Sequence, residues 1–279
     1  MANKKGDTTR IQAVPDVNKC TNLGCYSMKE REAYAVKTRK DQMLSTIYYF
    51  PDFEKPYTKT FKVEKGALGH GNGMCCAEKY IFFGCWVKDP DKSGREQQNY
   101  LIRVKYGKLT DNLTNGINIS VPEATGAIAF YKKSHLIIKV KSRNGYLMGK
   151  ILINEKGTAG RFDTLWTFYV KNTTGFSRGQ DIYYDAQTDC LFIPQCNNAN
   201  NVNKIMVVNL SGESETYKGN KLYTPQDIIT VDKQKDYSKY EIESLVIAPK
   251  RHIVMVANIV PKGTKTADDA VERISNLKF

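Results

Sequence analysis

Seven polar or aromatic side chains stand at or near the start of short apolar segments spread along the chain: Tyr26, His70, Asn72, Arg178, Gln180, Asp181 and Glu243. A polar group at the start of a buried strand costs free energy unless it bonds to protein, water or a ligand. In the segment Gly69-His70-Gly71-Asn72-Gly73, three glycines allow positive φ and a close approach of another group. These side chains are therefore predicted to hydrogen-bond a ligand. A water-filled channel lined by mutually bonded polar groups is the alternative.

Metal-binding and phosphate-binding patterns are missing from the sequence. It has no H-E-x-x-H motif, and its glycine-rich segment lacks the Lys-Ser/Thr ending of a phosphate-binding loop. The seven cysteines include no C-x-x-C pair, and we expect them to be reduced thiols that pack as small apolar side chains. No metal and no cofactor is expected.

A repeat of about fifty residues positions the seven side chains. Each copy has a short apolar strand, a tight polar turn and a second, strongly apolar strand, which is typical of a buried hairpin. Two further strand candidates follow in most copies. Equivalent anchors are 48, 54, 54 and 63 residues apart along the chain, at Tyr26, Met74, Ile128, Ile182 and Leu245.

Four antiparallel strands per repeat predict an all-β fold, namely a single five-bladed β-propeller over residues 1–279. The blades are expected at residues 20–64, 69–121, 124–171, 178–231 and 240–279. The last copy retains one clear outer strand, 271–279, so the N-terminal segment 8–14 is predicted to close that blade. A β-sandwich is the alternative fold. An α/β fold is excluded because no long amphipathic helical segment alternates with the strands.

The repeat and the glycine-rich segment carry two resemblances. The G-H-x-N pattern at 69–72 is similar to a motif that opens the inner strand in some bacterial and phage propeller-like proteins. The whole chain resembles five-bladed propellers as a class, which includes sugar-binding lectins and glycosidases that act on furanosides. That resemblance implies a ligand site at the mouth of the central channel. It also implies Asp181 and Glu243 as the two acids of a hydrolase. Those glycosidases have a third acid, an Asp in the first blade. The corresponding segment of this chain, Leu23-Gly24-Cys25-Tyr26, has no acid.

The formal net charge is +13 and the pI about 9.3, which favours a polyanionic partner such as nucleic acid or an anionic glycan. No long run of Lys or Arg occurs, so simple solvation of the lysines is the alternative. The first residues are polar rather than signal-like, and no apolar run reaches the roughly 18 residues of a membrane span. A cytoplasmic or virion-associated protein, bacterial or from a phage, is expected.

The sequence thus favours a non-enzymatic, monomeric binding module that recognises a glycan, a polyanion or a protein at the channel mouth. Two alternatives stay open. One is a glycoside hydrolase-like enzyme, with Glu243 as the acid and Asp181 as the base or nucleophile. The other is nucleic-acid binding through the basic surface.

Overall fold

β-strands make up most of the described part of the chain, which confirms the all-β prediction. The computed structural model describes residues 1–14, 19–27, 32–39, 41–52, 55–69, 73–88, 96–132, 135–140, 145–176, 179, 181–197, 202–231, 236–266 and 268–279. One short 3-10 helix, η1 (Asp111–Leu113), interrupts the strands in this part of the chain. No helix in the described ranges is long and apolar enough to cross a bilayer.

Two of the four sheets come from the first part of the chain. The smaller sheet has the order β3 (Lys19–Ser27), β4 (Glu32–Arg39), β5 (Ser45–Phe50), β6 (Lys59–Val63). The larger sheet has the order β11 (Thr125–Phe130), β12 (His135–Val140), β13 (Gly145–Ile153), β14 (Ala159–Val170), β10 (Ile117–Ser120), β9 (Glu96–Lys105), β8 (Tyr80–Lys88), β7 (Met74–Cys76). Its two halves join where β10 and β14 pair in parallel. A hairpin of β18 (Ser214–Tyr217) and β19 (Asn220–Tyr223) extends the free end of β14.

The other two sheets combine late strands with the two N-terminal strands. The third sheet has the order β1 (Ala2–Gly6), β20 (Asp227–Val231), β17 (Val202–Asn209), β16 (Cys190–Asn197), β15 (Tyr183–Asp185). The fourth has the order β2 (Thr8–Ala13), β23 (Ala270–Ile274), β22 (Ile253–Pro261), β21 (Tyr237–Ile247). Because β2 pairs antiparallel with β23, segments from both ends of the chain meet in one sheet.

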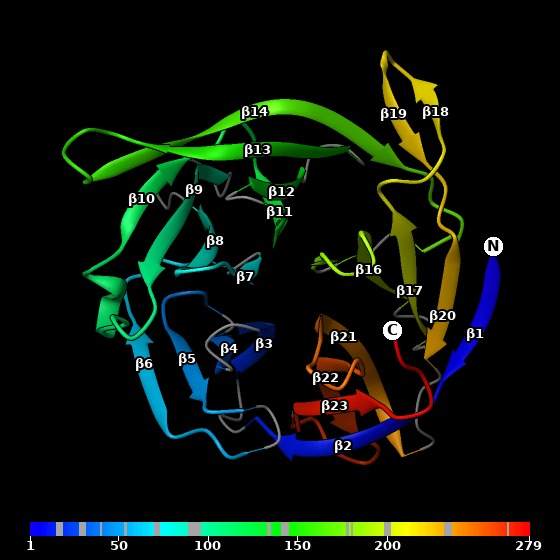
Figure 1. The fold of residues 1–279 in the computed structure, drawn as a ribbon. Coiled ribbons are helices and arrows are strands. Elements are labelled where there is room, and N and C mark those ends of the chain that lie inside the picture. Colours follow the sequence, from blue (N-terminus) through cyan, green and yellow to red (C-terminus); the bar gives the residue numbers. More distant parts are fainter. Residues whose placement is uncertain are drawn as a thin grey trace.

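The sheets stand around a common centre in a propeller-like ring (Figure 1). The strands β3, β7, β11 and β21 lie towards the middle, and β2, β6, β10 and β14 lie on the outside. Neighbouring inner strands contact one another in a cycle, from β3 to β7, β11, β15, β21 and back to β3. Inner strands of different sheets therefore bring residues that are distant in sequence to the same region.

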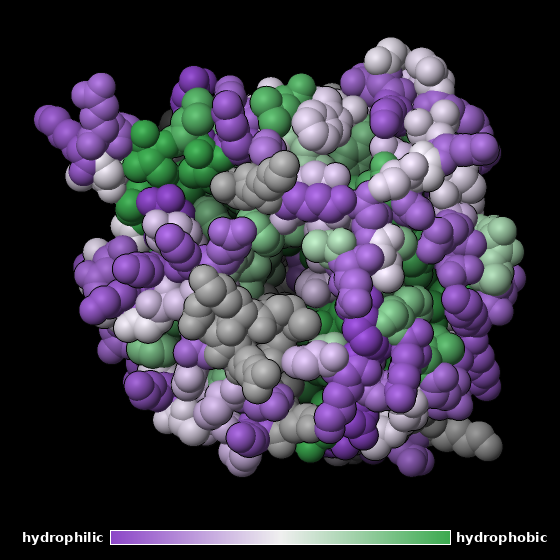
Figure 2. All heavy atoms as spheres, viewed as in Figure 1, coloured by the Kyte–Doolittle hydropathy of each residue, from purple (hydrophilic) through white to green (hydrophobic). Residues whose placement is uncertain are grey.

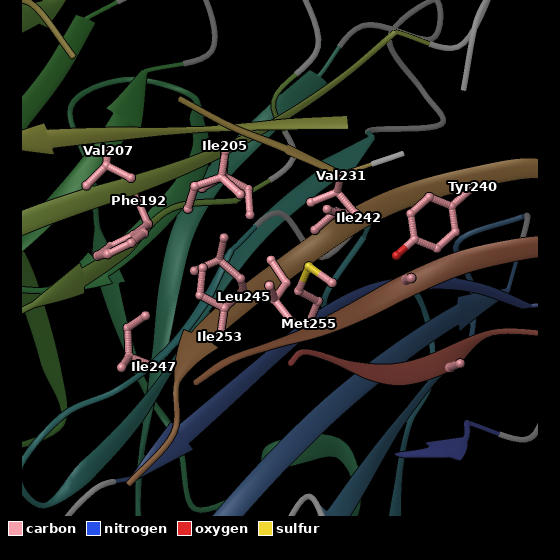
Figure 3. Close-up of a cluster of buried hydrophobic side chains, with 14 of the residues drawn as sticks. Phe192, Ile205, Val207, Val231, Tyr240, Ile242, Leu245, Ile247, Ile253 and Met255 are labelled. Carbon is pink, nitrogen blue, oxygen red and sulfur yellow. The ribbon is translucent and has the colours of Figure 1, made fainter. Parts of the chain in front are cut away.

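Apolar side chains fill the spaces between neighbouring sheets. The largest cluster lies between the third and fourth sheets, where Phe192 of β16 and Leu245 and Met255 of the fourth sheet are buried together (Figure 3). Burying a side chain of this size contributes about 1.5–3 kcal/mol. A second cluster, with Ala35 of β4 and Val254 of β22, joins the first sheet, made of β3 to β6, to the fourth sheet. Both neighbours of the fourth sheet thus hold it in place.

The last strand is shorter than the sequence predicts. β23 ends at Ile274 rather than continuing through 275–279. Asn276 instead accepts a hydrogen bond from the backbone N–H of Asp7, at 2.9 Å. The ring of Phe279 packs edge-on against Phe192, with centroids 5.3 Å apart. The final residues therefore leave the sheet to cover the core between the third and fourth sheets.

Gly149 permits a close approach of β13 and β14 at a β-bulge. The register shifts between Met148 and Gly149, and a Cβ at Gly149 would lie 2.3 Å from the carbonyl oxygen of Asp163. We expect Gly149→Ala to lower the free energy of unfolding by about 1–3 kcal/mol, as overpacking typically does. Gly212→Ala is the matched control, because its nearest contact would be an ordinary 3.4 Å. Equal urea midpoints for the two variants would contradict this account of the bulge.

Candidate acid–base site on the inner strands

Glu243 lies on β21, the innermost strand of its sheet (Figure 1). The register of β21 against β22 shifts between Ile242 and Ser244, which makes Glu243 the extra residue of a β-bulge. Bulges re-aim side chains and occur often near active sites. The Glu243 side chain is buried, and its Oε1 accepts a hydrogen bond from Asn258 Nδ2 at 3.3 Å.

Burial raises the pKa of the Glu243 carboxyl well above its usual range, and the negative charge of Glu241 raises that pKa further. The positive charge of Lys239 and the hydrogen bond from Asn258 act in the opposite direction without outweighing burial. Desolvation disfavours the charged form of a carboxyl. Glu243 therefore keeps its proton at pH values where an exposed glutamate is ionised.

Glu241 is the second buried carboxyl of β21, and its environment differs from that of Glu243. Lys239 Nζ lies 2.9 Å from Glu241 Oε2, in an ion pair whose lysine is 38% exposed. Cys196 of β16 donates its thiol to Glu241 Oε1, with the sulfur 3.1 Å from the oxygen. A nearby cation favours the ionised form of a carboxyl. The two buried glutamates thus differ in their partners, because Glu241 forms an ion pair whereas Glu243 accepts a hydrogen bond from a neutral amide.

Asp181 forms a second polar group with Lys139. Burial raises the pKa of Asp181 well above its usual range, although the Ile182 backbone N–H and the charge of Lys139 lower it in part. Burial also lowers the pKa of Lys139. Lys139 Nζ donates to the carbonyl of Gly179 at 3.0 Å, and Asp181 Oδ1 has no hydrogen-bond partner among the residues that the structure describes. Desolvation thus outweighs the attraction between these two groups.

The buried carboxyls are costly to the fold. An unpaired polar atom in the interior typically costs about 1–3 kcal/mol. Carboxyls with strongly perturbed pKa values cluster at functional sites, where a loss of stability is tolerated because the chemistry requires the buried group. Glu243 and Asp181 are accordingly the strongest candidates for functional carboxyls in the described part of the chain.

The structure describes only some of the residues predicted from the sequence. His70, Asn72, Arg178 and Gln180 lie outside the described residues. Tyr26 lies on the described backbone of β3, but its side chain is outside the described set.

Asp181 and Glu243 are both described and buried, and each has its own neighbours. Asp181 faces Lys139, whereas Glu243 faces Glu241 and Asn258. The pairing of Asp181 with Glu243 as acid and base stays a prediction.

Sequence reasoning missed Lys139 and one motif. The signal for Lys139 is a single lysine in the apolar run Leu136-Ile137-Ile138-Lys139-Val140. The motif is the G-x-S-x-G pattern at 175–179, whose serine falls outside the described residues. A nucleophile elbow requires a strand followed by a helix. The next element here is the strand β15, so the context of an elbow is not met.

The donor set does not suggest a metal centre. Within the described ranges, no group of three or more His, Cys, Asp and Glu side chains is arranged to hold a metal ion.

The thiol of Cys75 is buried, and burial raises its pKa well above the usual range, so it is not poised as a thiolate.

The comparisons with known proteins give structural neighbours only. No family model and no curated protein matches the chain. A xylan β-1,4-xylosidase from Bacillus halodurans superposes with a TM-score of 0.56 at 8% identity, over 91% of this chain and 52% of that one. The GH43 protein BlXynB from Bacillus licheniformis gives 0.52 at 12% identity, over 95% and 54%. A β-xylosidase named RS223 gives 0.53 at 7% identity, over 91% of both chains.

The fold is β-propeller-like. At identities this low, the similarity shows a shared fold and does not show a shared activity. The chain spans about half the length of the two Bacillus proteins and nearly the whole of the third.

Proposed function

We propose that the chain forms five propeller blades with the boundaries predicted from the sequence. The cycle of contacts among β3, β7, β11, β15 and β21 supports this division, because each inner strand begins one blade. In this division the larger sheet supplies two blades, joined at their outer strands β10 and β14. The antiparallel pairing of β2 with β23 closes the last blade.

We further propose that the protein hydrolyses glycosidic bonds, with Glu243 as the proton donor. The observation that carries this proposal is the buried Glu243 carboxyl, which keeps its proton beside a second, ion-paired carboxyl. Glycoside hydrolysis needs one carboxyl that protonates the leaving oxygen and another that activates water or attacks the sugar. Environments that push two carboxyls towards opposite protonation states divide these roles.

In this proposal Glu241 is a better second carboxyl than Asp181. Its ion pair with Lys239 stabilises the carboxylate, whereas burial keeps Asp181 protonated. As the bond from the anomeric carbon to the leaving oxygen breaks, the Glu243 proton passes to that oxygen. A water molecule adds to the anomeric carbon, and Glu241 takes up its proton in a direct displacement. Asp181 and Lys139 would then hydrogen-bond the sugar.

The structural neighbours guide the choice between hydrolysis and binding. The three neighbours described above are named as xylosidases or as a member of GH43, which favours the hydrolase interpretation over a non-enzymatic module. Figure 2 shows a narrow hollow near the middle of one face of the molecule. In this proposal a sugar enters there.

The first experiment is release of p-nitrophenol from aryl β-xylosides and aryl α-arabinofuranosides. We expect turnover by the wild type and a loss of about 10²–10⁴-fold in kcat for Glu241→Gln, the range for removal of a general base. Asp181→Asn should raise KM more than it lowers kcat. If Asp181→Asn instead lowered kcat strongly and Glu241→Gln mainly raised KM, Asp181 rather than Glu241 would be the base. No turnover of any glycoside in a broad panel would contradict the proposal.

A further inference from the structure

A cleft on the outside of the ring lies away from the inner-strand carboxyls. It is lined by residues of β13, β14 and β19 and by the segments that follow β11 and β17, and its volume is about 400 Å³. The hairpin of β18 and β19, which projects from the ring in Figure 1, borders it. Small-molecule sites commonly have volumes of about 300–1,000 Å³. The cleft is therefore large enough for one or two sugar rings.

Aromatic side chains form much of its lining. Trp166 is 45% exposed, although large aromatic side chains are usually well covered. Phe168 packs edge-on against Tyr223, with centroids 5.8 Å apart, and this contact fixes the rings. The Tyr223 hydroxyl donates to the carbonyl of Leu210 at 3.1 Å. The aromatic surface is thus held in place before any ligand arrives.

Polar groups stand beside this aromatic surface. Lys221 Nζ lies 5.8 Å from the centroid of the Tyr223 ring, and no carboxylate in the described part of the chain lies within ion-pair distance of it. The indole N–H of Trp166 makes no hydrogen bond to any described residue. Thr167 and Asn220 complete the polar part of the lining. The cleft therefore offers one unpaired cation and several neutral polar groups.

We propose that this cleft binds an acidic saccharide, a uronic acid unit or a short chain of them. A sugar ring presents an apolar face to an aromatic ring and hydroxyls to the polar groups around it. Lys221 supplies a single positive charge, which matches one carboxylate. A nucleotide phosphate typically requires several converging donors or a helix N-terminus, and the lining residues offer neither. This proposal does not depend on hydrolysis at Glu243.

The test compares methyl β-D-glucuronide, methyl β-D-glucoside and adenosine monophosphate as probes. Trp86→Phe leaves Trp166 as the single tryptophan, because the chain has two. Its fluorescence then reports occupancy of the cleft. We expect the glucuronide to bind at least tenfold more tightly than the glucoside. Equal affinities for the two sugars, or tighter binding of the nucleotide, would overturn the assignment.

Two variants locate the site. Lys221→Met should remove the preference for the glucuronide, whereas Lys265→Met, which removes an exposed charge elsewhere, should keep it. Trp166→Ala, measured by calorimetry, should weaken both sugars at least tenfold and change the thermal midpoint little, because Trp166 is 45% exposed. Unchanged binding by Lys221→Met or Trp166→Ala would place the sugar elsewhere.

Discussion

Replacing Lys37 by Met is expected to lower the free energy of unfolding by about 3–5 kcal/mol, the cost of breaking a buried ion pair by removing one partner. Lys37 of β4 and Asp269, which precedes β23, are 1% and 0% exposed, and Lys37 Nζ lies 3.2 Å from Asp269 Oδ2. Lys37 Nζ also donates to the carbonyl of Val14, at 3.2 Å. The backbone N–H of Val14 donates to the carbonyl of Asp269, at 2.7 Å. The lysine therefore joins the first sheet to the place where the two ends of the chain meet.

Urea unfolding checks this expectation, with Lys4→Met as the matched control. The ion pair of Lys4 with Asp227 has a similar length of 2.8 Å, but its side chains are 39% and 17% exposed. Pairs near the surface contribute at most about 1 kcal/mol. The double variant Lys37→Met/Asp269→Asn should recover part of the loss, because no uncompensated buried charge remains. Similar unfolding midpoints for Lys37→Met and Lys4→Met would contradict the role given to the buried pair.

Glu243→Gln is expected to lower the kcat of xylobiose hydrolysis by about 10²–10⁴-fold, the range for loss of a general acid. The same change should leave the free energy of unfolding at pH 7 equal or higher. Burial, with the charge of Glu241 added, raises the pKa of Glu243 in the folded protein. Stability linked to its proton is fully present below the unfolded value of about 4.3 and is lost as pH rises through the folded value. Glutamine is neutral at every pH, so the free energy of unfolding of the variant does not fall as pH rises through the folded pKa of Glu243.

Glu272→Gln is the matched control for this experiment. Glu272 lies on β23 of the same sheet, is fully buried and accepts a hydrogen bond from the Tyr240 hydroxyl. Its surroundings are those of the core rather than of the Glu241 and Lys239 pair. We expect Glu272→Gln to retain the activity of the wild type. Equal loss of activity in the two variants would show that Glu243 acts through the fold alone.

The strands could be predicted because their cause is local. Segments such as 136–138 in β12 and 190–193 in β16 carry consecutive apolar residues next to tight polar turns, and this pattern indicates a buried hairpin. Other pairings have no such signal. β18 is exposed at every position and has no apolar periodicity, and β1 pairs in parallel with β20, far along the chain. Only the tertiary fold determines those contacts.

The candidate site was predictable only in part. Asp181 and Glu243 stand at or near the start of apolar segments, so their types and positions could be noticed in the sequence. The charged neighbours of Glu243, Glu241 and Lys239, lie on its own strand, but its burial and the surroundings of Asp181 depend on other strands. Lys139 comes from β12, and Cys196 of β16 binds the neighbouring carboxyl of Glu241. Burial is the largest cause of both pKa shifts, and burial is set by the packing of the whole fold rather than by a local pattern.

The dependence of hydrolysis on the leaving group tests the central claim most directly. A dinitrophenolate departs without a proton, whereas the sugar released from xylobiose needs one from the general acid. If Glu243 donates that proton, Glu243→Gln should hydrolyse dinitrophenyl β-xyloside at nearly the wild-type rate and lose at least a hundredfold in kcat/KM on xylobiose. An equal loss on both substrates would contradict the assignment of Glu243 as the proton donor.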